Sequence, residues 1–263
     1  MDYSQLFSLR HKVVVITGGS GYLGSAVTKG MLALGARVAI ADKVEPTFLG
    51  EWGDQGIWVS YDASNTDSVK EVFRRTKAAF GRIDALVNCA SYGSKAGPES
   101  SLERLTDEDW QSGVEGALGS VFRCTREAIP YLRESGGSSI VNFSSMYGIV
   151  SPDPAIYGDS NADNPPNYGA GKAGILQFTR YCAAHLAADG IRVNSVTPGP
   201  FPNMATLKLK QDDAFQRKLK DKTMLRRVGV PDDIAGPVIL LVSDASSFMT
   251  GTNIAVDGGW TAW

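Results

Sequence analysis

Residues 12–24 read KVVVITGGSGYLG, a short apolar run that passes directly into a glycine-rich turn. The run at 12–17 has the length of a buried strand, and the segment 22–34 that follows has the spacing of a helix. The turn holds four glycines, of which Gly18, Gly21 and Gly24 are evenly spaced. Glycines let the backbone come close to a pyrophosphate, whose charge is favoured at a helix N-terminus. The stretch predicts a dinucleotide site, with a plain strand–turn–helix connection as the alternative.

The same alternation of strand and helix continues along the chain. Six further apolar runs are strand candidates: 37–41, 57–61, 83–88, 139–144, 192–197 and 253–256. Four further segments have helical length: 66–80, 106–133, 168–188 and 231–243. Continuously apolar strands are typical of parallel sheets covered on both faces, and their connections are right-handed crossovers. We therefore predict an α/β fold with a doubly wound parallel sheet of about seven strands.

The composition of the 263 residues, 43% hydrophobic and 21% charged, is that of a globular protein, and we expect a single domain over residues 1–263. A balance of 26 basic and 28 acidic residues argues against nucleic acid or an anionic membrane surface as a partner. No apolar run approaches the roughly 20 residues that span a bilayer, and the first ten residues do not resemble a secretory signal. Three scattered cysteines and two histidines predict reduced thiols, a cytoplasmic location and no metal site.

Two mostly polar segments interrupt the alternation, and each follows a strand candidate. Residues 149–167 read IVSPDPAIYGDSNADNPPN, and residues 200–222 are polar and amphipathic. Open α/β sheets bind ligands at the carboxyl ends of their strands. We therefore expect a substrate-loop insertion at about 149–167 and a lid-like segment at about 200–222. The polar side chains of the insertion favour a sugar or polyol over a lipid; a solvated loop or a subunit contact is the alternative.

Asp42 closes the second strand candidate, 18 residues after Gly24. A carboxylate there can accept both hydroxyls of the adenosine ribose and would repel a 2'-phosphate. The cofactor predicted is therefore NAD, with NADP the less favoured alternative. Lys43 instead favours NADP, because a lysine can pair with that phosphate. A solvated acid at a strand end is the other interpretation of Asp42.

The sequence YGAGK places Tyr168 and Lys172 at positions i and i+4, on one face of a predicted helix. A free phenol ionises near pH ~10, and both an ammonium group and a cationic nicotinamide favour its ionised form. Tyr168 is thus a candidate acid–base group, exchanging a proton with an alcohol or carbonyl while hydride moves to or from the cofactor. His11 and His185 offer no credible Ser-His-Asp arrangement: His11 is expected at the surface and His185 at the edge of the core.

In order along the chain, these motifs resemble the short-chain dehydrogenases/reductases, in their short single-domain branch. The resemblance covers about Leu9 to Trp260 and rests on TGGSGYLG, Asp62, NCAS at 88–91, SIVNFSSMYG, YGAGK, RVNSVTPG and TGTNIAVDGGW. It implies a Rossmann-type fold, an oxidoreductase with NAD and a small-molecule substrate, and a homo-oligomer. Family members are usually tetramers, in which the helices near 106–133 and 168–188 pair across subunits.

The resemblance also implies a role for each matching residue. Ser145 would hydrogen-bond the substrate oxygen, Tyr168 would be the acid–base group, and Lys172 would bind the nicotinamide ribose and favour the phenolate. The implied cofactor-binding residues are Gly18, Gly21, Tyr22, Leu23, Gly24, Asp42, Asp62, Ala63, Asn88, Ala90, Tyr168, Lys172, Pro198 and Gly199.

Three features depart from the short-branch pattern. Tyr22 replaces the middle glycine, so the glycine spacing matches the extended, sugar-nucleotide branch. Ala117 stands where the family has an asparagine that relays protons. Another asparagine or a water would have to relay the proton in this chain. Ser145 and Tyr168 are 23 residues apart, farther than is usual.

Three functions follow from these observations. The leading hypothesis is an NAD(H)-dependent oxidoreductase that interconverts a secondary alcohol and a ketone on a small polar substrate. A sugar-nucleotide epimerase- or dehydratase-like enzyme would suit the glycine spacing, but too few residues follow the sixth strand for a second substrate domain. A non-catalytic NAD-binding sensor would suit Ala117, although the retention of Ser145, Tyr168 and Lys172 argues against it.

Overall fold

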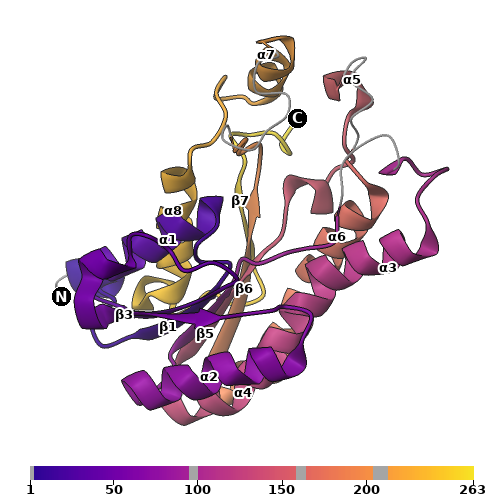
Figure 1. The fold of residues 1–263 in the computed structure, drawn as a ribbon. Coiled ribbons are helices and arrows are strands. Elements are labelled where there is room, and N and C mark those ends of the chain that lie inside the picture. Colours follow the sequence, from indigo (N-terminus) through magenta and orange to yellow (C-terminus); the bar gives the residue numbers. More distant parts are fainter. Residues whose placement is uncertain (1–2, 95–99, 158–163, 204–212) are drawn as a thin grey trace.

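The computed structural model describes residues 3–94, 100–157, 164–203 and 213–263. Within these ranges, seven parallel strands form one sheet in the order β3-β2-β1-β4-β5-β6-β7 (Figure 1). The strands are β1 (Val13–Thr17), β2 (Arg37–Asp42), β3 (Gly56–Ser60), β4 (Ala85–Asn88), β5 (Ser138–Phe143), β6 (Ile191–Pro198) and β7 (Asn253–Val256). The predicted doubly wound, Rossmann-type sheet is confirmed.

Helices cover both faces of the sheet, as Figure 1 shows. On one face lie α1 (Tyr22–Ala33) and α8 (Pro231–Val242); on the other lie α2 (Thr66–Phe80), α4 (Ser120–Ser135) and α6 (Pro166–Leu186). Two short helices, α5 (Pro154–Tyr157) and α7 (Asp213–Lys222), lie beyond the carboxyl ends of the strands. Turns of 3-10 helix complete the elements at Tyr3–Phe7, Leu49–Gln55, Met146–Gly148, Ala187–Asp189 and Asp244–Ser246.

The long helix predicted at 106–133 contains an irregularity. It begins as α3 (Asp107–Val114), passes through a π turn at Glu115–Gly119 and continues as α4. Gly116 in this turn lies against the carbonyl of Tyr92, where a Cβ atom would collide with it. The turn therefore admits the backbone that follows β4, and Ala117 lies inside it.

The apolar character of the strands is explained by two cores. In β1, Val15 packs with α2, α4 and α6, whereas Val14 and Ile16 pack with α1 and α8. Because successive side chains of a strand point to opposite faces, a strand covered on both sides must be apolar throughout. All five residues of β1 are buried.

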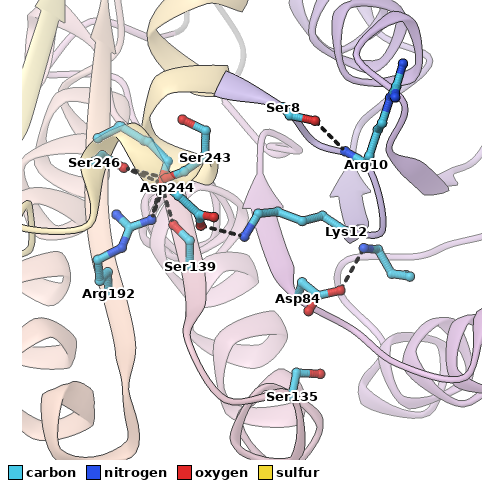
Figure 2. Close-up of polar contacts among 12 residues, drawn as sticks. Ser8, Arg10, Lys12, Asp84, Ser135, Ser139, Arg192, Ser243, Asp244 and Ser246 are labelled. Atoms are coloured by element: carbon cyan, nitrogen blue, oxygen red, sulfur yellow. Dashed lines mark hydrogen bonds and ion pairs between the residues drawn. The ribbon is translucent and has the colours of Figure 1, made fainter. Parts of the chain in front are cut away.

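A polar cluster fastens the amino ends of the strands to the end of α8 (Figure 2). The guanidinium of Arg192 on β6 donates to the carbonyls of Leu241 at 3.0 Å, Ser243 at 3.2 Å and Met249 at 3.3 Å. The Ser139 hydroxyl donates to the Leu241 carbonyl as well, at 2.8 Å. At Leu241 and Ser243 these donors satisfy carbonyl groups of a helix C-terminus that have no partner within the helix.

Arg192→Met should lower the free energy of unfolding by about 1.5–3 kcal/mol, because the charge-assisted hydrogen bonds of the guanidinium are lost while neutral donors such as Ser139 and Asn194 remain on the same carbonyls. Urea unfolding of the two proteins measures this difference. Lys12→Met is the matched control: Lys12 pairs with Asp244 at 2.8 Å, but that carboxylate is 67% exposed. Such pairs contribute about 0.2–1 kcal/mol. Equal losses in the two variants would contradict the role assigned to Arg192.

Candidate active site

A cleft of about 490 Å³ opens at the carboxyl ends of the central strands. It lies where the strand order reverses: β2 and β3 extend the sheet on one side of β1, and β4 is added on the other side. Open α/β sheets bind their ligands at such a switch point. The sequence-predicted residues that line it are Gly18, Gly21, Tyr22, Leu23, Gly24, Asp42, Ala63, Ala90, Ser145, Tyr168, Lys172, Pro198 and Gly199.

Two predicted cofactor residues have side chains that do not line this cleft. The Asp62 carboxylate accepts hydrogen bonds from the Ser64 hydroxyl at 2.7 Å and the Ser64 N–H at 2.9 Å, and these bonds lower its pKa. The Asn88 amide is 2% exposed and donates to Asn142 at 2.9 Å and Thr125 at 3.3 Å. Asp62 thus holds the turn at Ser64, whereas Asn88 bonds to side chains of α4 and β5 beneath the cleft.

Eight further residues line the cleft: Lys43, Tyr61, Cys89, Ser91, Tyr92, Phe143, Ser144 and Phe201. Most are direct neighbours in sequence of predicted site residues. Extending each motif by one or two positions finds Lys43, Cys89, Ser91 and Ser144. The same extension reaches Tyr92, two positions after Ala90, but its contacts with a helix distant in sequence follow only from the fold.

The glycine-rich turn forms a cradle for an anionic group. Gly18 has a φ of +69°, and a Cβ added to it would lie 2.9 Å from the backbone of Ala90. A Cβ on Gly24 would collide with the Gly18 carbonyl. Gly21, the N-cap of α1, supplies no side-chain cap to the first turn, which also holds no acidic residue. The free space and the uncapped helix N-terminus fit a pyrophosphate.

Asp42 is held in a fixed orientation at the mouth of the cleft. One carboxylate oxygen accepts from the Ser20 N–H at 3.0 Å and the other from the Val44 N–H at 3.3 Å. Each oxygen has a second lone pair for another donor. The half-buried carboxylate therefore fits a diol at the cleft wall, beside the exposed Lys43.

Tyr168 and Lys172 lie on one face of α6, as the i, i+4 spacing predicts. The Lys172 side chain is 5% exposed, and its ammonium donates to the Phe143 carbonyl at 2.9 Å. The same nitrogen lies 5.7 Å from the centre of the Tyr168 ring. A lysine buried this deeply has a restricted position, so its charge acts on the tyrosine from a fixed point.

Ser145 reaches the same cleft from the end of β5. It is 7% exposed, and its oxygen accepts the Tyr147 N–H at 3.2 Å, which leaves its hydroxyl hydrogen for another acceptor. The Ser144 hydroxyl donates to the Lys172 carbonyl at 2.8 Å, so this strand end is bonded directly to α6. The fold thus brings Ser145, Tyr168 and Lys172 together despite the long intervening segment.

Ala117 lies behind this group. It is 1% exposed, and a Cβ added to Gly171, next to Lys172, would lie 2.7 Å from its methyl group. The methyl group offers no hydrogen bond to a proton relay. Any water that takes this part must find its partners elsewhere.

The insertion and the lid-like segment contact each other. Asp153 forms an ion pair with Lys222 at 2.6 Å, and the Lys218 ammonium donates to the Ala155 carbonyl at 2.7 Å. Beneath these bonds lies an apolar cluster, here called the roof cluster: Met146, Ile156, Phe215, Leu219 and Trp260. The polar residues Asp159, Ser160, Asn161 and Asp163 of the insertion lie outside the described residues.

In the part of the chain that the structure describes, no group of three or more His, Cys, Asp or Glu side chains is placed to hold a metal ion. In the same residues, no helix combines the length and the apolar character that crossing a membrane requires.

Comparisons with known proteins match almost the whole chain. A family model described as enoyl-(acyl carrier protein) reductase matches residues 21–261. The chain is 33% identical to cis-4-hydroxycyclohexanecarboxylate dehydrogenase of Sinomonas cyclohexanicum, over 95% of this chain and 97% of that one. It is 31% identical to 2-dehydro-3-deoxy-D-gluconate 5-dehydrogenase of Escherichia coli, over 97% and 98%. A crystal structure of a short-chain dehydrogenase from Leptospira borgpetersenii with bound NAD+ superposes with a TM-score of 0.85 at 34% identity, covering 97% of this chain and 94% of that one.

Proposed function

The chain belongs to the short-chain dehydrogenases/reductases, and on that basis we propose that it is an NAD(H)-dependent enzyme interconverting a secondary alcohol and a ketone. One observation carries the proposal: Ser145, Tyr168 and Lys172 line the same cleft as the glycine cradle and Asp42. An acid–base group and a dinucleotide site in one cleft are what hydride transfer to or from a carbonyl carbon requires.

The chain's own groups handle the oxygen and its proton. When bound, the nicotinamide supplies a hydride acceptor or donor. Ser145 donates its free hydroxyl hydrogen to the substrate oxygen and so orients it. The phenolate of Tyr168 takes the alcohol proton during oxidation, and the phenol returns it to the carbonyl oxygen during reduction. The fixed ammonium of Lys172 stabilises the phenolate.

The cofactor proposed is NAD, because Asp42 is oriented by two backbone N–H groups and would repel a 2'-phosphate. Lys43 beside it is exposed, and its ammonium would instead favour such a phosphate over a free ribose hydroxyl. The relative of known structure from Leptospira borgpetersenii holds NAD+.

The proposed substrate is a small, polar, sugar- or polyol-like alcohol. Two relatives that the chain matches over nearly their whole length are named for a hydroxycyclohexane carboxylate and a dehydrodeoxygluconate. We propose that residues 1–263 act as one domain, with the 149–167 insertion as a wall of the substrate pocket and the 200–222 segment as its lid. The contacts between α5 and α7 support this pairing.

We also propose a cytoplasmic homotetramer. The three cysteines Cys89, Cys124 and Cys182 are free thiols, as in a reducing compartment. Helices α4 and α6 present Phe122 and Tyr181, whose side chains are 44% and 58% exposed. Exposed aromatic side chains on neighbouring helices are typical of an interface between subunits.

The test of the proposed function is NADH formation with NAD and a panel of sugars, polyols and hydroxycyclohexane carboxylates, together with NAD(P)H oxidation by 3-oxoacyl thioesters. Turnover of a polyol or cyclic alcohol with NAD supports the proposal. Turnover of the 3-oxoacyl thioesters alone would show that the substrate is an acyl thioester and not a sugar- or polyol-like alcohol. NAD that stays bound through purification, without net NADH formation, would favour an epimerase. NAD binding without any turnover would favour a sensor.

A second prediction concerns the roof cluster. Ile156 of the insertion, which is 3% exposed, belongs to this cluster together with Phe215 and Leu219 of α7. Ile156→Ala should raise KM for the best alcohol substrate about tenfold, because the substrate wall loses its support, while the Kd for NADH stays unchanged. Phe248→Ala is the control, since Phe248 is fully exposed and belongs to neither the insertion nor the roof cluster. An unchanged KM in a folded Ile156→Ala variant would argue against the insertion as a substrate wall.

A further inference from the structure

Arg123, in the first turns of α4, joins three segments of the chain that are distant in sequence. Its Nε donates to the Ala63 carbonyl at 2.9 Å, and its Nη2 donates to the Tyr92 hydroxyl at 3.0 Å. Its Nη1 donates to the carboxylate of Glu115, in the π turn. The Arg123 side chain is only 12% exposed, so its bonds to Ala63 and Tyr92 are partly buried, whereas the Glu115 carboxylate is 51% exposed.

The first two of these partners line the cofactor cleft. Ala63 belongs to the loop after β3, and Tyr92 belongs to the loop after β4. Loops of this kind have conformational freedom that a ligand must remove when it binds. A guanidinium presents its donors in a rigid plane, so one side chain fixes both loops at a set separation.

The surrounding sequence is adapted to this arrangement. Gly119 leaves the space that the Glu115 carboxylate occupies, because a Cβ there would collide with it. Gly116 leaves the space for the backbone of Tyr92, whose N–H donates to the Gly116 carbonyl at 3.4 Å. The carboxylate of Glu115 neutralises the Arg123 charge and holds the guanidinium toward the cleft wall. The π turn thus supports the arginine as well as the loop.

We propose that Arg123 is a positioning residue of the cofactor cleft, holding Ala63 and Tyr92 in the arrangement that NAD(H) requires. The inference rests on the proposed function, since it takes NAD(H) to be the occupant of this cleft. Arg123 does not line the cleft, so it acts through its two partners. Its loss should therefore weaken cofactor binding and leave the chemistry of the bound complex nearly unchanged.

The test compares Arg123→Met and Arg123→Lys with the wild type. The Kd for NADH is measured by fluorescence, and kcat is measured at saturating NAD. Arg123→Met should raise the Kd for NADH about five- to thirtyfold, because the loops of Ala63 and Tyr92 must then be ordered when the cofactor binds. The value of kcat should change less than about threefold. Arg123→Lys keeps the charge but loses the planar fork, so its Kd should lie in between.

Arg133→Met is the matched control. Arg133 lies on the same helix and forms an ion pair with Asp189 at 2.9 Å, away from the cleft. Both Kd and kcat of this variant should equal those of the wild type. An unchanged Kd in a folded Arg123→Met protein overturns the inference, and so does an equal rise in the Arg133→Met control.

Tyr92→Phe keeps the test decisive if Arg123→Met does not fold, because it removes a single hydroxyl. It should raise the Kd for NADH about twofold to fivefold. Where Arg123→Met does fold, Tyr92→Phe should raise the Kd for NADH less in that background than in the wild type, because both substitutions remove the same hydrogen bond. A Kd equal to that of the wild type overturns the inference. Failure of the wild type itself to bind NADH overturns the proposed function, and this inference with it.

Discussion

Tyr168→Phe should lower kcat for alcohol oxidation by about 10²–10⁴-fold, the usual contribution of a general acid–base group, while the Kd for NADH changes little. The substitution removes one hydroxyl and keeps the ring over which the Lys172 ammonium lies. Steady-state NADH formation measures kcat, and NADH fluorescence measures binding. More than a tenth of the wild-type rate at the chemical step would exclude Tyr168 as the proton carrier.

Tyr181→Phe is the matched control for this experiment. Tyr181 lies on the same helix, is 58% exposed and stacks on His185, away from the cleft. Its hydroxyl has no part in the proposed chemistry, so the rate should stay at the wild-type value. A comparable loss in both variants would show that disturbance of α6, and not removal of a reacting proton, lowers the rate.

The features predicted correctly from the sequence are those set by short-range patterns. Strand and helix periodicity predicted the sheet because each strand packs on both faces. The spacing of Tyr168 and Lys172 is a helical repeat, and the glycines of the first turn lie within seven consecutive residues. Such arrangements depend on neighbours within one or two turns, which the sequence displays directly.

The features that the sequence could not reveal depend on distant contacts. Arg123 bonds to Ala63 across 60 residues of chain, and no local pattern distinguishes it from the exposed arginines of α4. The ion pair of Asp153 with Lys222 likewise joins two segments whose proximity only the fold determines. The sequence predicts regular helix at the π turn around Ala117, although this turn holds Gly116 and Gly119, because its backbone geometry follows from the approach of Tyr92, a distant contact.

Asp42→Ala should raise the KM and the Kd for NAD about ten- to hundredfold and narrow the preference for NAD over NADP. The expected size follows from charge-assisted hydrogen bonds to a ribose diol, which contribute about 1.5–3 kcal/mol. The kcat/KM values for the two cofactors, measured with one alcohol, give the preference. Most of the change in this preference should come from weaker NAD binding. Binding of NADP improves only because a repulsive negative charge is removed.

Loss of the carboxylate also leaves the N–H groups of Ser20 and Val44 without their acceptors, so the loop after β2 could move in Asp42→Ala. Asp42→Asn separates the two effects, because its amide oxygen still accepts one of these N–H groups while the negative charge is gone. If the charge decides the cofactor, Asp42→Asn should shift the preference toward NADP nearly as far as Asp42→Ala does. A wild-type protein that uses NADP as well as NAD or better would overturn the role of Asp42 and point to Lys43 as the group that selects the cofactor.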